Sequence, residues 1–345
     1  MKERIIDAGL SFFRVTGLDR AASFVTRGQG AILMFHNVRP GRPRAYAPNQ
    51  PLEVTPEFLE STIELLKKLD YEIVAIGDVP ARIEQNNGNR FAALTFDDGY
   101  RDNIDIAAPI LRRYGAPYAI YVTTGFVERT ARLWWLELEA AIGLLDRVDM
   151  KIAGESFSAT AHTAEEKHSA YVGAYAFLRR HEESAMRDCV SALIEQSGAE
   201  ASFTELCMTW DEIRAAITDP LCTIGAHTLT HARLTLHSDD AVRRELMESK
   251  QTIERELGRP VLHLAYPFGD SGSARQREFS IARECGYETA LTTRPGVLFK
   301  AHREHMMALP RLAVHGGWQD ARSLESLLTG APFALWNLGR RVNVS

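Results

Sequence analysis

Short apolar runs alternate with amphipathic stretches in the first third and again in the last third of the chain. Such runs are typical of strands buried on both faces, whereas apolar residues three or four positions apart are typical of helices. Buried strands are predicted over residues 31–36, 71–75, 91–96, 118–122, 222–227, 263–266 and 289–292, and helices over 55–69, 103–114, 209–217, 239–257 and 274–285. Strands that alternate with helices form parallel sheets or barrels. The predicted fold class is therefore α/β, with chemistry expected just past the strand ends.

A helix-rich, charged stretch over about 130–208 interrupts this alternation, and strand character is evident there only over about 151–157. We interpret the stretch as an insertion packed on the main domain. The predicted organisation is an N-terminal helical segment over 1–29, followed by a barrel over 30–345 that contains the insertion. Residues 3–27 have an amphipathic pattern, and a helix packed on the domain is favoured over one lying on a membrane surface.

Composition narrows the class of protein without identifying it. The chain has 345 residues, 45% of them hydrophobic and 25% charged, which is ordinary for a globular protein. The net charge of −5 gives no reason to expect a nucleic-acid partner. The four cysteines show no C-x-x-C pair, and no apolar run of signal-peptide length follows the N-terminus. A cytoplasmic protein is therefore expected.

Two motifs carry candidate chemistry. Asp97 and Asp98 stand side by side at the end of the strand predicted over 91–96, and Gly99 allows a tight turn beside them. His227 and His231 follow the strand predicted over 222–227. Two imidazoles and one carboxylate are the ligand set of a metal that activates water, and the second carboxylate is then available as a general base.

Other candidate residues surround these motifs. The strand ending at Tyr266 runs into Pro267-Phe268-Gly269, a turn whose backbone N–H groups are suited to face a developing oxyanion. Tyr100, directly after the aspartates, is expected to border the groove. Trp134 and its neighbour Trp135 are candidates to stack on sugar rings, with packing inside the insertion as the alternative.

The two motifs resemble those of the polysaccharide deacetylases of the NodB-homology type, carbohydrate esterase family four. The run Thr95–Gly99, residues 95–99, matches that family's first motif, and residues 227–231 match its second, H-[ST]-x-x-H. The resemblance covers about residues 30–128 and 209–315. It implies a distorted, incomplete (β/α) barrel that holds one divalent metal ion, usually zinc.

The same resemblance implies a role for each matched residue. Asp98, His227 and His231 would bind the metal, and Asp97 would be the base that takes a proton from the attacking water. A backbone N–H near Phe268 would stabilise the oxyanion, and a protonated histidine would donate to the leaving amine.

Besides the 130–208 stretch, the chain departs from the family's pattern at two positions. The third motif, R-x-P-Y, reads Ala265-Tyr266-Pro267-Phe268 here, so the arginine that orients the base is missing. Arg311 or Arg294 is expected to replace it from another loop. The acid histidine has two candidates: His36, at the end of the first predicted strand, and His315, near the C-terminal position that is usual in the family. His36 is favoured because a histidine that ends a barrel strand points at the site.

The function expected from the resemblance is metal-dependent hydrolysis of an N-acetyl group from a sugar, oligosaccharide or polysaccharide, with release of acetate. The protein would then be a hydrolase of non-peptide carbon–nitrogen bonds, with a carbohydrate as its partner. Two alternatives stay open: an O-acetyl ester or non-sugar amide hydrolase, and a catalytically weak carbohydrate-binding subunit. The sequence leaves the acceptor sugar and the oligomeric state open and does not indicate membrane association.

Overall fold

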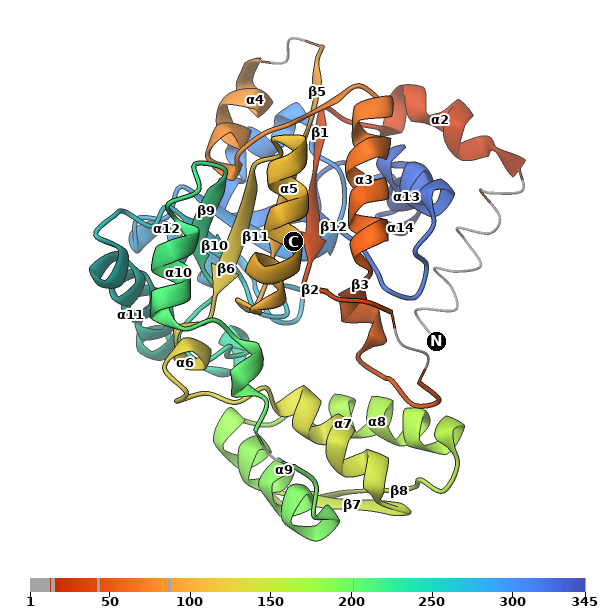
Figure 1. Cartoon of the computed structure of the whole chain (residues 1–345), viewed down its shortest axis with the longest axis vertical. Helices are drawn as coiled ribbons and strands as arrows, with labels where there is room; N and C mark the ends of the chain where they lie inside the picture. The colour runs from red at the N-terminus through yellow and green to blue at the C-terminus, as the bar shows by residue number, and fades with distance from the viewer. Residues whose placement is uncertain (1–12, 14–15, 42–43, 86–87, 201, 345) are drawn as a thin grey trace.

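A closed barrel of parallel strands forms the centre of the molecule (Figure 1). The computed structural model describes residues 13, 16–41, 44–85, 88–200 and 202–344. The strands of the main sheet are β1 (Gly30–Phe35), β4 (Tyr71–Ile73), β5 (Arg90–Phe96), β6 (Tyr118–Val122), β9 (Cys222–Ala226), β10 (His263–Ala265), β11 (Thr289–Pro295) and β12 (Leu309–Ala313). Their order is β1-β12-β11-β10-β9-β6-β5-β4, and the additional pairing of β1 with β5 closes the ring.

The ring contains seven of the eight strands, because β4 and β6 share one edge of β5. Its first residues pair with β4, in the register Tyr71↔Arg90, whereas its last residues pair with β6, in the register Leu94↔Tyr118. On its other edge β5 pairs with β1. Strand β4 is therefore an extra strand beside a closed seven-stranded barrel. The predicted α/β barrel fold is confirmed.

Helices cover the outside of the barrel (Figure 1). They are α2 (Leu18–Thr26), α3 (Pro56–Lys68), α4 (Val79–Gln85), α5 (Ala108–Tyr114), α6 (Thr124–Val127), α10 (Trp210–Ala216), α11 (Asp239–Leu257), α12 (Gln276–Glu284), α13 (Ala321–Leu328) and α14 (Ala331–Trp336). Single turns complete the shell at η1 (Gln50–Leu52), η2 (Ile76–Asp78), η3 (Asn103–Ala107), η4 (Thr204–Leu206), η5 (Leu234–Leu236), η6 (Lys300–Glu304) and η7 (Met306–Ala308). Local sequence sets several helix starts: Thr55 caps α3, and Thr209 and Glu212 form a capping box on α10.

The structure differs from the sequence prediction at strand β12 and in the 130–208 segment. Strand β12 was not predicted, because Pro310 and Arg311 interrupt its apolar pattern. In the 130–208 segment, the strand character expected over about 151–157 belongs to a longer antiparallel hairpin of β7 (Arg147–Ile152) and β8 (Glu155–Thr160).

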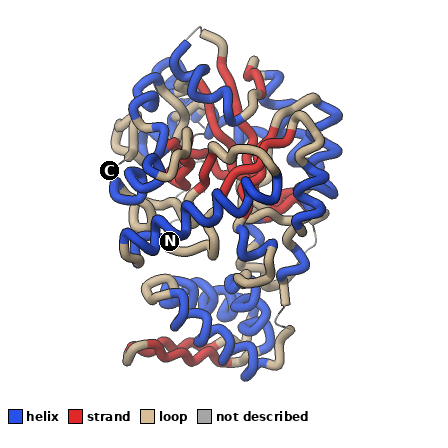
Figure 2. Tube along the Cα trace, turned by 90° about the vertical axis from the view of Figure 1, so that its left-hand side faces the viewer, coloured by secondary structure: helices blue, strands red, loops and turns tan. Residues whose placement is uncertain are grey.

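The 130–208 segment lies below the carboxyl ends of the barrel strands as a layer of its own (Figures 1 and 2). The hairpin packs with α7 (Trp134–Leu144), α8 (Ala164–Leu178) and α9 (Glu183–Ser197). Their apolar side chains form a core that is separate from the core of the barrel. This second core includes Leu138, Ile142, Val148, Phe177 and Leu193. The segment therefore has a hydrophobic core of its own beside the barrel's edge.

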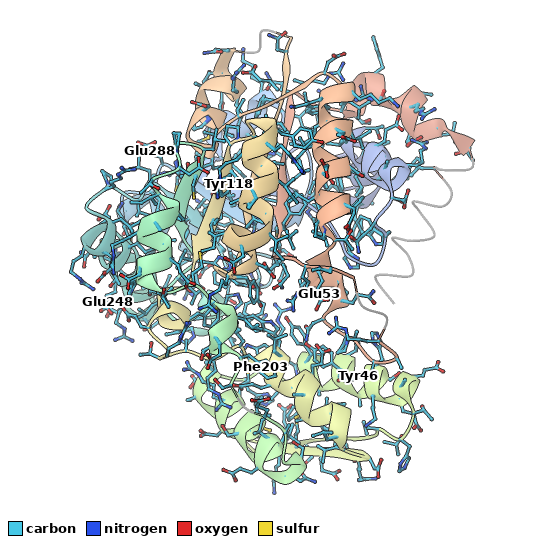
Figure 3. The ribbon with its side chains drawn as sticks, in the orientation of Figure 1. Tyr46, Glu53, Tyr118, Phe203, Glu248 and Glu288 are labelled. Atoms are coloured by element: carbon cyan, nitrogen blue, oxygen red, sulfur yellow. The ribbon has the colours of Figure 1, made fainter. Side chains whose placement is uncertain are left out.

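One loop of the barrel crosses to this segment. The loop leads into β3 (Glu53–Val54), which pairs with β2 (Asn37–Val38). Asn49 donates from Nδ2 to the carbonyl oxygen of Trp135, at 3.2 Å, and accepts a hydrogen bond from the hydroxyl of Tyr171, at 2.9 Å. Tyr46, which Figure 3 shows beside α8, packs against the core of the segment, while Glu53 stays on the barrel side.

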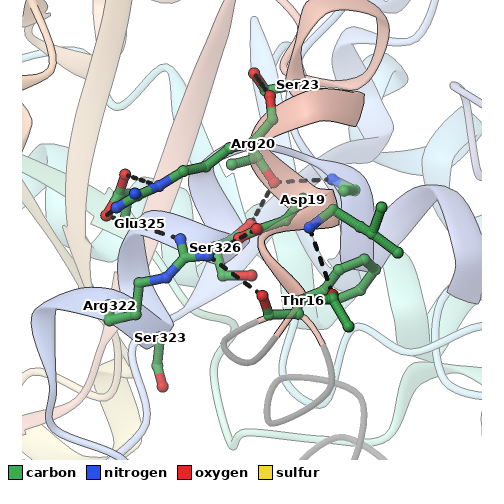
Figure 4. A network of polar contacts seen from close by, with 12 residues as sticks. Thr16, Asp19, Arg20, Ser23, Arg322, Ser323, Glu325 and Ser326 are labelled. Carbon is green, nitrogen blue, oxygen red and sulfur yellow. Dashed lines mark hydrogen bonds and ion pairs between the residues drawn. The ribbon is translucent and has the colours of Figure 1, made fainter.

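The described part of the N-terminal region packs on the barrel's last helices. Helix α2 lies against α14, and Arg20 pairs with Glu325 of α13 at 3.0 Å (Figure 4). The buried carboxylate of Asp19 accepts a hydrogen bond from Arg322 at 2.7 Å. Residues 3–12, 14 and 15 of the amphipathic stretch predicted over 3–27 lie outside the described residues. Among the helices that the structure describes, none is long and apolar enough to cross a membrane.

Candidate active site

The polar motifs found in the sequence meet at one end of the barrel. Asp97 and Asp98 follow β5, His227 follows β9, and Phe268 lies in the turn after β10. All these strands are parallel, so their carboxyl ends share one edge of the barrel. Arg311 reaches the same edge from within β12.

Asp98, His227 and His231 form a compact cluster. Oδ1 of Asp98 lies 3.4 Å from Nε2 of His227 and 3.3 Å from Nε2 of His231. One ligand atom from each residue lies within 4.8 Å of the other two. Oδ1 of Asp98 is buried and has no hydrogen-bond partner among the described residues. Since buried acceptors are almost always satisfied, the cluster has the character of a cation site.

The tautomer of His227 strengthens this interpretation. Its Nδ1 lies 2.8 Å from the carbonyl oxygen of Ala265, which only accepts hydrogen bonds, so Nδ1 carries the proton. In the neutral ring, Nε2 then presents a lone pair toward the carboxylate of Asp98. A lone pair and a carboxylate at this distance fit a shared metal ion.

A network under the second motif holds the two histidines. Thr228 and His231 both have positive φ, 64° and 61°, which is costly for residues other than glycine. The hydroxyl of Thr228 accepts a hydrogen bond from the His231 N–H at 3.0 Å. The carboxylate of Glu245, from α11, accepts from the N–H groups of Leu229 and Thr230 at 3.0 and 2.9 Å, and from the Thr230 hydroxyl at 2.8 Å. No sequence pattern indicated Glu245, because it lies on a different element from the loop that it holds.

Asp97 is paired with Arg311. Nη1 and Nη2 of Arg311 donate to the two oxygens of Asp97, both at 2.7 Å, and Nε donates to the carbonyl oxygen of Thr292 at 3.0 Å. The Arg311 side chain is completely buried, with 0% of its surface exposed. Burial would raise the pKa of Asp97, but the adjacent guanidinium lowers it, with the net result below the ordinary value.

Of the two arginines expected to orient the base, the structure brings Arg311 to Asp97. It does so from a strand, whereas the sequence placed it in a loop. Arg294 is also buried, but its guanidinium donates to the carbonyl oxygens of Ala274 and Asn343. The bidentate geometry at Asp97 is therefore supplied by Arg311.

The two candidate histidines follow neighbouring strands, β1 and β12. Burial lowers the pKa of His36 below its ordinary value, although the charges of Asp98 and Asp97 oppose this shift. The ring of His315 stacks on that of Trp318, with 4.8 Å between their centroids and 6° between their planes, and its Nδ1 accepts the Gly317 N–H.

Comparison with known proteins agrees with this geometry. The family model described as polysaccharide deacetylase matches residues 84–290, which is more than half of the chain. The chain belongs to the polysaccharide deacetylase family. The matched region contains the aspartate pair and both histidines of the Asp98–His227–His231 cluster, while His36 and Arg311 lie outside it. No curated protein sequence matches the chain.

Solved structures of deacetylases share the fold. The deacetylase PplD of Streptococcus pyogenes, solved in complex with acetate, is 19% identical, with a TM-score of 0.57 over 86% of this chain and 97% of that one. IcaB from Ammonifex degensii is 15% identical, with a TM-score of 0.56 over 88% of this chain and 98% of that one. The de-N-acetylase from Aggregatibacter actinomycetemcomitans is 13% identical, with a TM-score of 0.54 over 86% of this chain and 99% of that one. At these identities the likeness concerns the fold.

The third motif of this family member places its two aromatic residues differently. Phe268 has a φ of 61°, and its ring lies 5.0 Å from that of His231, so the turn borders the metal-site cluster. Tyr266, a candidate oxyanion or substrate residue beside this turn, does not face the site: its side chain is buried in the barrel core, and its hydroxyl donates to the carbonyl oxygen of Met307 at 3.1 Å.

The remaining aromatic candidates are covered. Tyr100 is buried in the core of the 130–208 segment, although the charge of Asp98 reaches its hydroxyl. Trp134, expected to contact sugar, is only 5% exposed and stacks on Tyr175 at 5.0 Å, so it follows the packing alternative. Trp135 instead reaches the site, with its ring 4.9 Å from that of His231.

Proposed function

We propose that this protein hydrolyses the acetamide of an N-acetylated sugar residue in an oligosaccharide or polysaccharide and releases acetate. The observation that carries the proposal is a buried Asp98–His227–His231 cluster directly beside an Asp97–Arg311 pair. Membership of the polysaccharide deacetylase family supports the removal of an acetyl group from a carbohydrate.

The donor set suits a divalent ion, for which we propose zinc. Two nitrogen ligands and one oxygen ligand leave a position for water or substrate, as in catalytic zinc sites. A zinc ion bound by Asp98, His227 and His231 would supply Lewis-acid chemistry and lower the pKa of water to about 7.

The protein's own residues then divide the proton transfers. Asp97 takes a proton from the water that attacks the acetyl carbonyl carbon. Arg311 occupies one lone pair on each Asp97 oxygen, which fixes the carboxylate and leaves a second lone pair to accept that proton. The N–H of Phe268 stabilises the oxyanion, and His36 donates a proton to the sugar nitrogen as the carbon–nitrogen bond breaks. The products are acetate and a free amine.

The alternative of a catalytically weak carbohydrate-binding subunit loses its support. It depended on the missing arginine of the third motif, and Arg311 pairs with Asp97 from another strand. An O-acetyl ester substrate remains the competing proposal, because the same groups would serve either bond.

Acetate release from N-acetylglucosamine oligomers and from an O-acetylated sugar polymer, assayed side by side, tests the proposal. We expect turnover of the amide to dominate and the Asp97→Asn variant to keep its metal while losing at least about 100-fold in kcat, since it lacks the base. Turnover of the ester alone would contradict amide hydrolysis and support the competing proposal of an O-acetyl esterase. Full activity of Asp97→Asn would show that Asp97 is not the base.

A further inference from the structure

The 130–208 segment touches the metal-site cluster directly. Trp135 of α7 lies 4.9 Å from the ring of His231, and Phe126, at the end of the barrel's α6, lies 5.8 Å from the same ring. The segment therefore forms one wall of the proposed active site.

Two further side chains of the segment extend this wall. Tyr175 and Arg179 are four residues apart at the C-terminal end of α8, so they share one face of the helix. The guanidinium carbon of Arg179 lies 4.4 Å from the ring centre of Phe268 and 5.7 Å from that of Tyr175. Arg179 Nη2 also donates to Asp270 of the barrel at 2.8 Å. Arg179 thus joins three other side chains into one continuous group: Tyr175, Phe268 and Asp270.

This group is accessible, unlike the tryptophans behind it. The side chains of Arg179 and Asp270 are 25% and 45% exposed, and Tyr175 is half-buried. Burial and the charges of Asp270 and Asp98 raise the pKa of the Tyr175 hydroxyl, so it stays protonated and able to donate a hydrogen bond.

The chemistry of the group matches an uncharged sugar ring. A phenol, a guanidinium and a carboxylate together offer donors and an acceptor for neighbouring hydroxyl groups. The positive charge of Arg179 is balanced by Asp270, which leaves no net charge to select an acidic or a basic sugar. Aromatic surface combined with a few fixed polar groups is typical of small-molecule recognition.

We propose that Tyr175 and Arg179 of the 130–208 segment, with Asp270 of the barrel, form a subsite for the uncharged sugar residue next to the one that loses its acetyl group. This inference rests on the proposed function and extends it: the protein recognises at least two linked sugar residues. Its preferred substrate is therefore a chain and not a monosaccharide.

Steady-state kinetics on the N-acetylglucosamine tetramer and monomer test the subsite. For Arg179→Ala we expect a rise of about tenfold or more in KM for the tetramer, with kcat, metal content and monomer turnover nearly unchanged. Tyr175→Phe, which keeps the ring and removes one donor, should raise the same KM by a smaller factor. Arg180→Ala is the matched control, because Arg180 is 63% exposed and pairs with Glu155 inside the segment.

Two results would overturn the subsite: equal tetramer KM values for Arg179→Ala and Arg180→Ala, or an equal loss on both substrates. If the wild-type protein releases no acetate from either substrate, the proposed function fails. Calorimetric binding of the tetramer to metal-loaded wild type, Arg179→Ala and Arg180→Ala then decides the subsite separately. Absence of tetramer binding to the wild type would also count against it.

Discussion

The pairing of Asp97 with Arg311 places the proposed base under the control of a single guanidinium. Both side chains are buried, and both oxygens of Asp97 accept hydrogen bonds from Arg311. A buried ion pair adds little net stability by itself, but removal of one partner leaves an unpaired buried charge. Changes at Arg311 should therefore affect both the acidity of Asp97 and the fold.

Replacement of Arg311 by methionine should shift the pH dependence of turnover. Without the guanidinium, burial dominates and the pKa of Asp97 rises. The base is active as the carboxylate, so the acidic limb of kcat/KM should move to higher pH, with about 3–5 kcal/mol lost from the free energy of unfolding. Arg294→Met, a change at the other buried arginine, should leave that limb in place. An acidic limb unmoved in Arg311→Met would contradict the assignment.

Glu245 should act on the metal site without contacting the metal. Its carboxylate accepts three hydrogen bonds from residues 229 and 230, and a neutral glutamine amide in its place forms weaker bonds because the negative charge is lost. We expect Glu245→Gln to weaken zinc binding by about 10–100-fold, the usual effect of losing a residue that orients metal ligands. Competition with a chromophoric chelator measures this affinity.

Glu248 provides the matched control for this substitution. It lies one turn further along α11, exposed at the outer surface of the molecule (Figure 3). Glu248→Gln removes the same charge from the same helix and should leave zinc affinity unchanged. Equal affinities for the Glu245 and Glu248 variants would rule out a positioning role for Glu245.

At the scale of elements, the attachment of α9 to the barrel depends on pH. Glu183, in the first turn of α9, accepts from the backbone N–H of Arg233 at 2.7 Å and pairs with Nε2 of His237 at 2.6 Å. The hydrogen bond to Glu183 raises the pKa of His237. Burial would raise the pKa of Glu183, but the hydrogen bonds from His237 and the Arg233 N–H outweigh burial, so the pKa lies below its ordinary value. The pair thus joins the 130–208 segment to the loop that follows the second motif.

Replacement of His237 by glutamine should destabilise the protein most in mildly acidic solution. The stabilisation from His237 is complete below its unfolded pKa of about 6.5 and is lost as the pH rises through its raised folded pKa. The stabilisation from Glu183 is complete above its unfolded pKa of about 4.3 and is lost as the pH falls through its lowered folded pKa. Urea unfolding should show a cost of about 1–2 kcal/mol at pH 5.5 and less at pH 9. The same cost at both values would contradict a charged pair.

The sequence predicted those elements whose local pattern was unambiguous. Strands β1, β5 and β6 are continuous apolar runs, and α3 and α10 carry their caps in the sequence. Strand β12 escaped prediction because its central residue, Arg311, is a charge that turns into the barrel. Such a residue is stable there only because Asp97 is opposite, and a local pattern does not contain that information.

At the scale of the whole molecule, the site draws on segments that are remote in the chain. The aspartates and histidines were predicted to meet because parallel strands end at one edge. Arg311, by contrast, is 214 residues from Asp97, and the wall formed by Trp135, Tyr175 and Arg179 depends on how the 130–208 segment packs against the barrel. The sequence offered Arg311 only as one of two candidate arginines, and no pattern indicated the wall, because sequence patterns report local periodicity.

The central claim is that a metal at Asp98, His227 and His231 is required for deacetylation, and a zinc titration tests it most directly. Protein stripped by a chelator and supplied with zinc in steps is assayed for acetate release from the N-acetylglucosamine tetramer. We expect no release from stripped protein, recovery that is complete near one zinc per chain, and no recovery in His227→Ala. Undiminished release from fully stripped protein, or none from the zinc-loaded wild type, would contradict the claim.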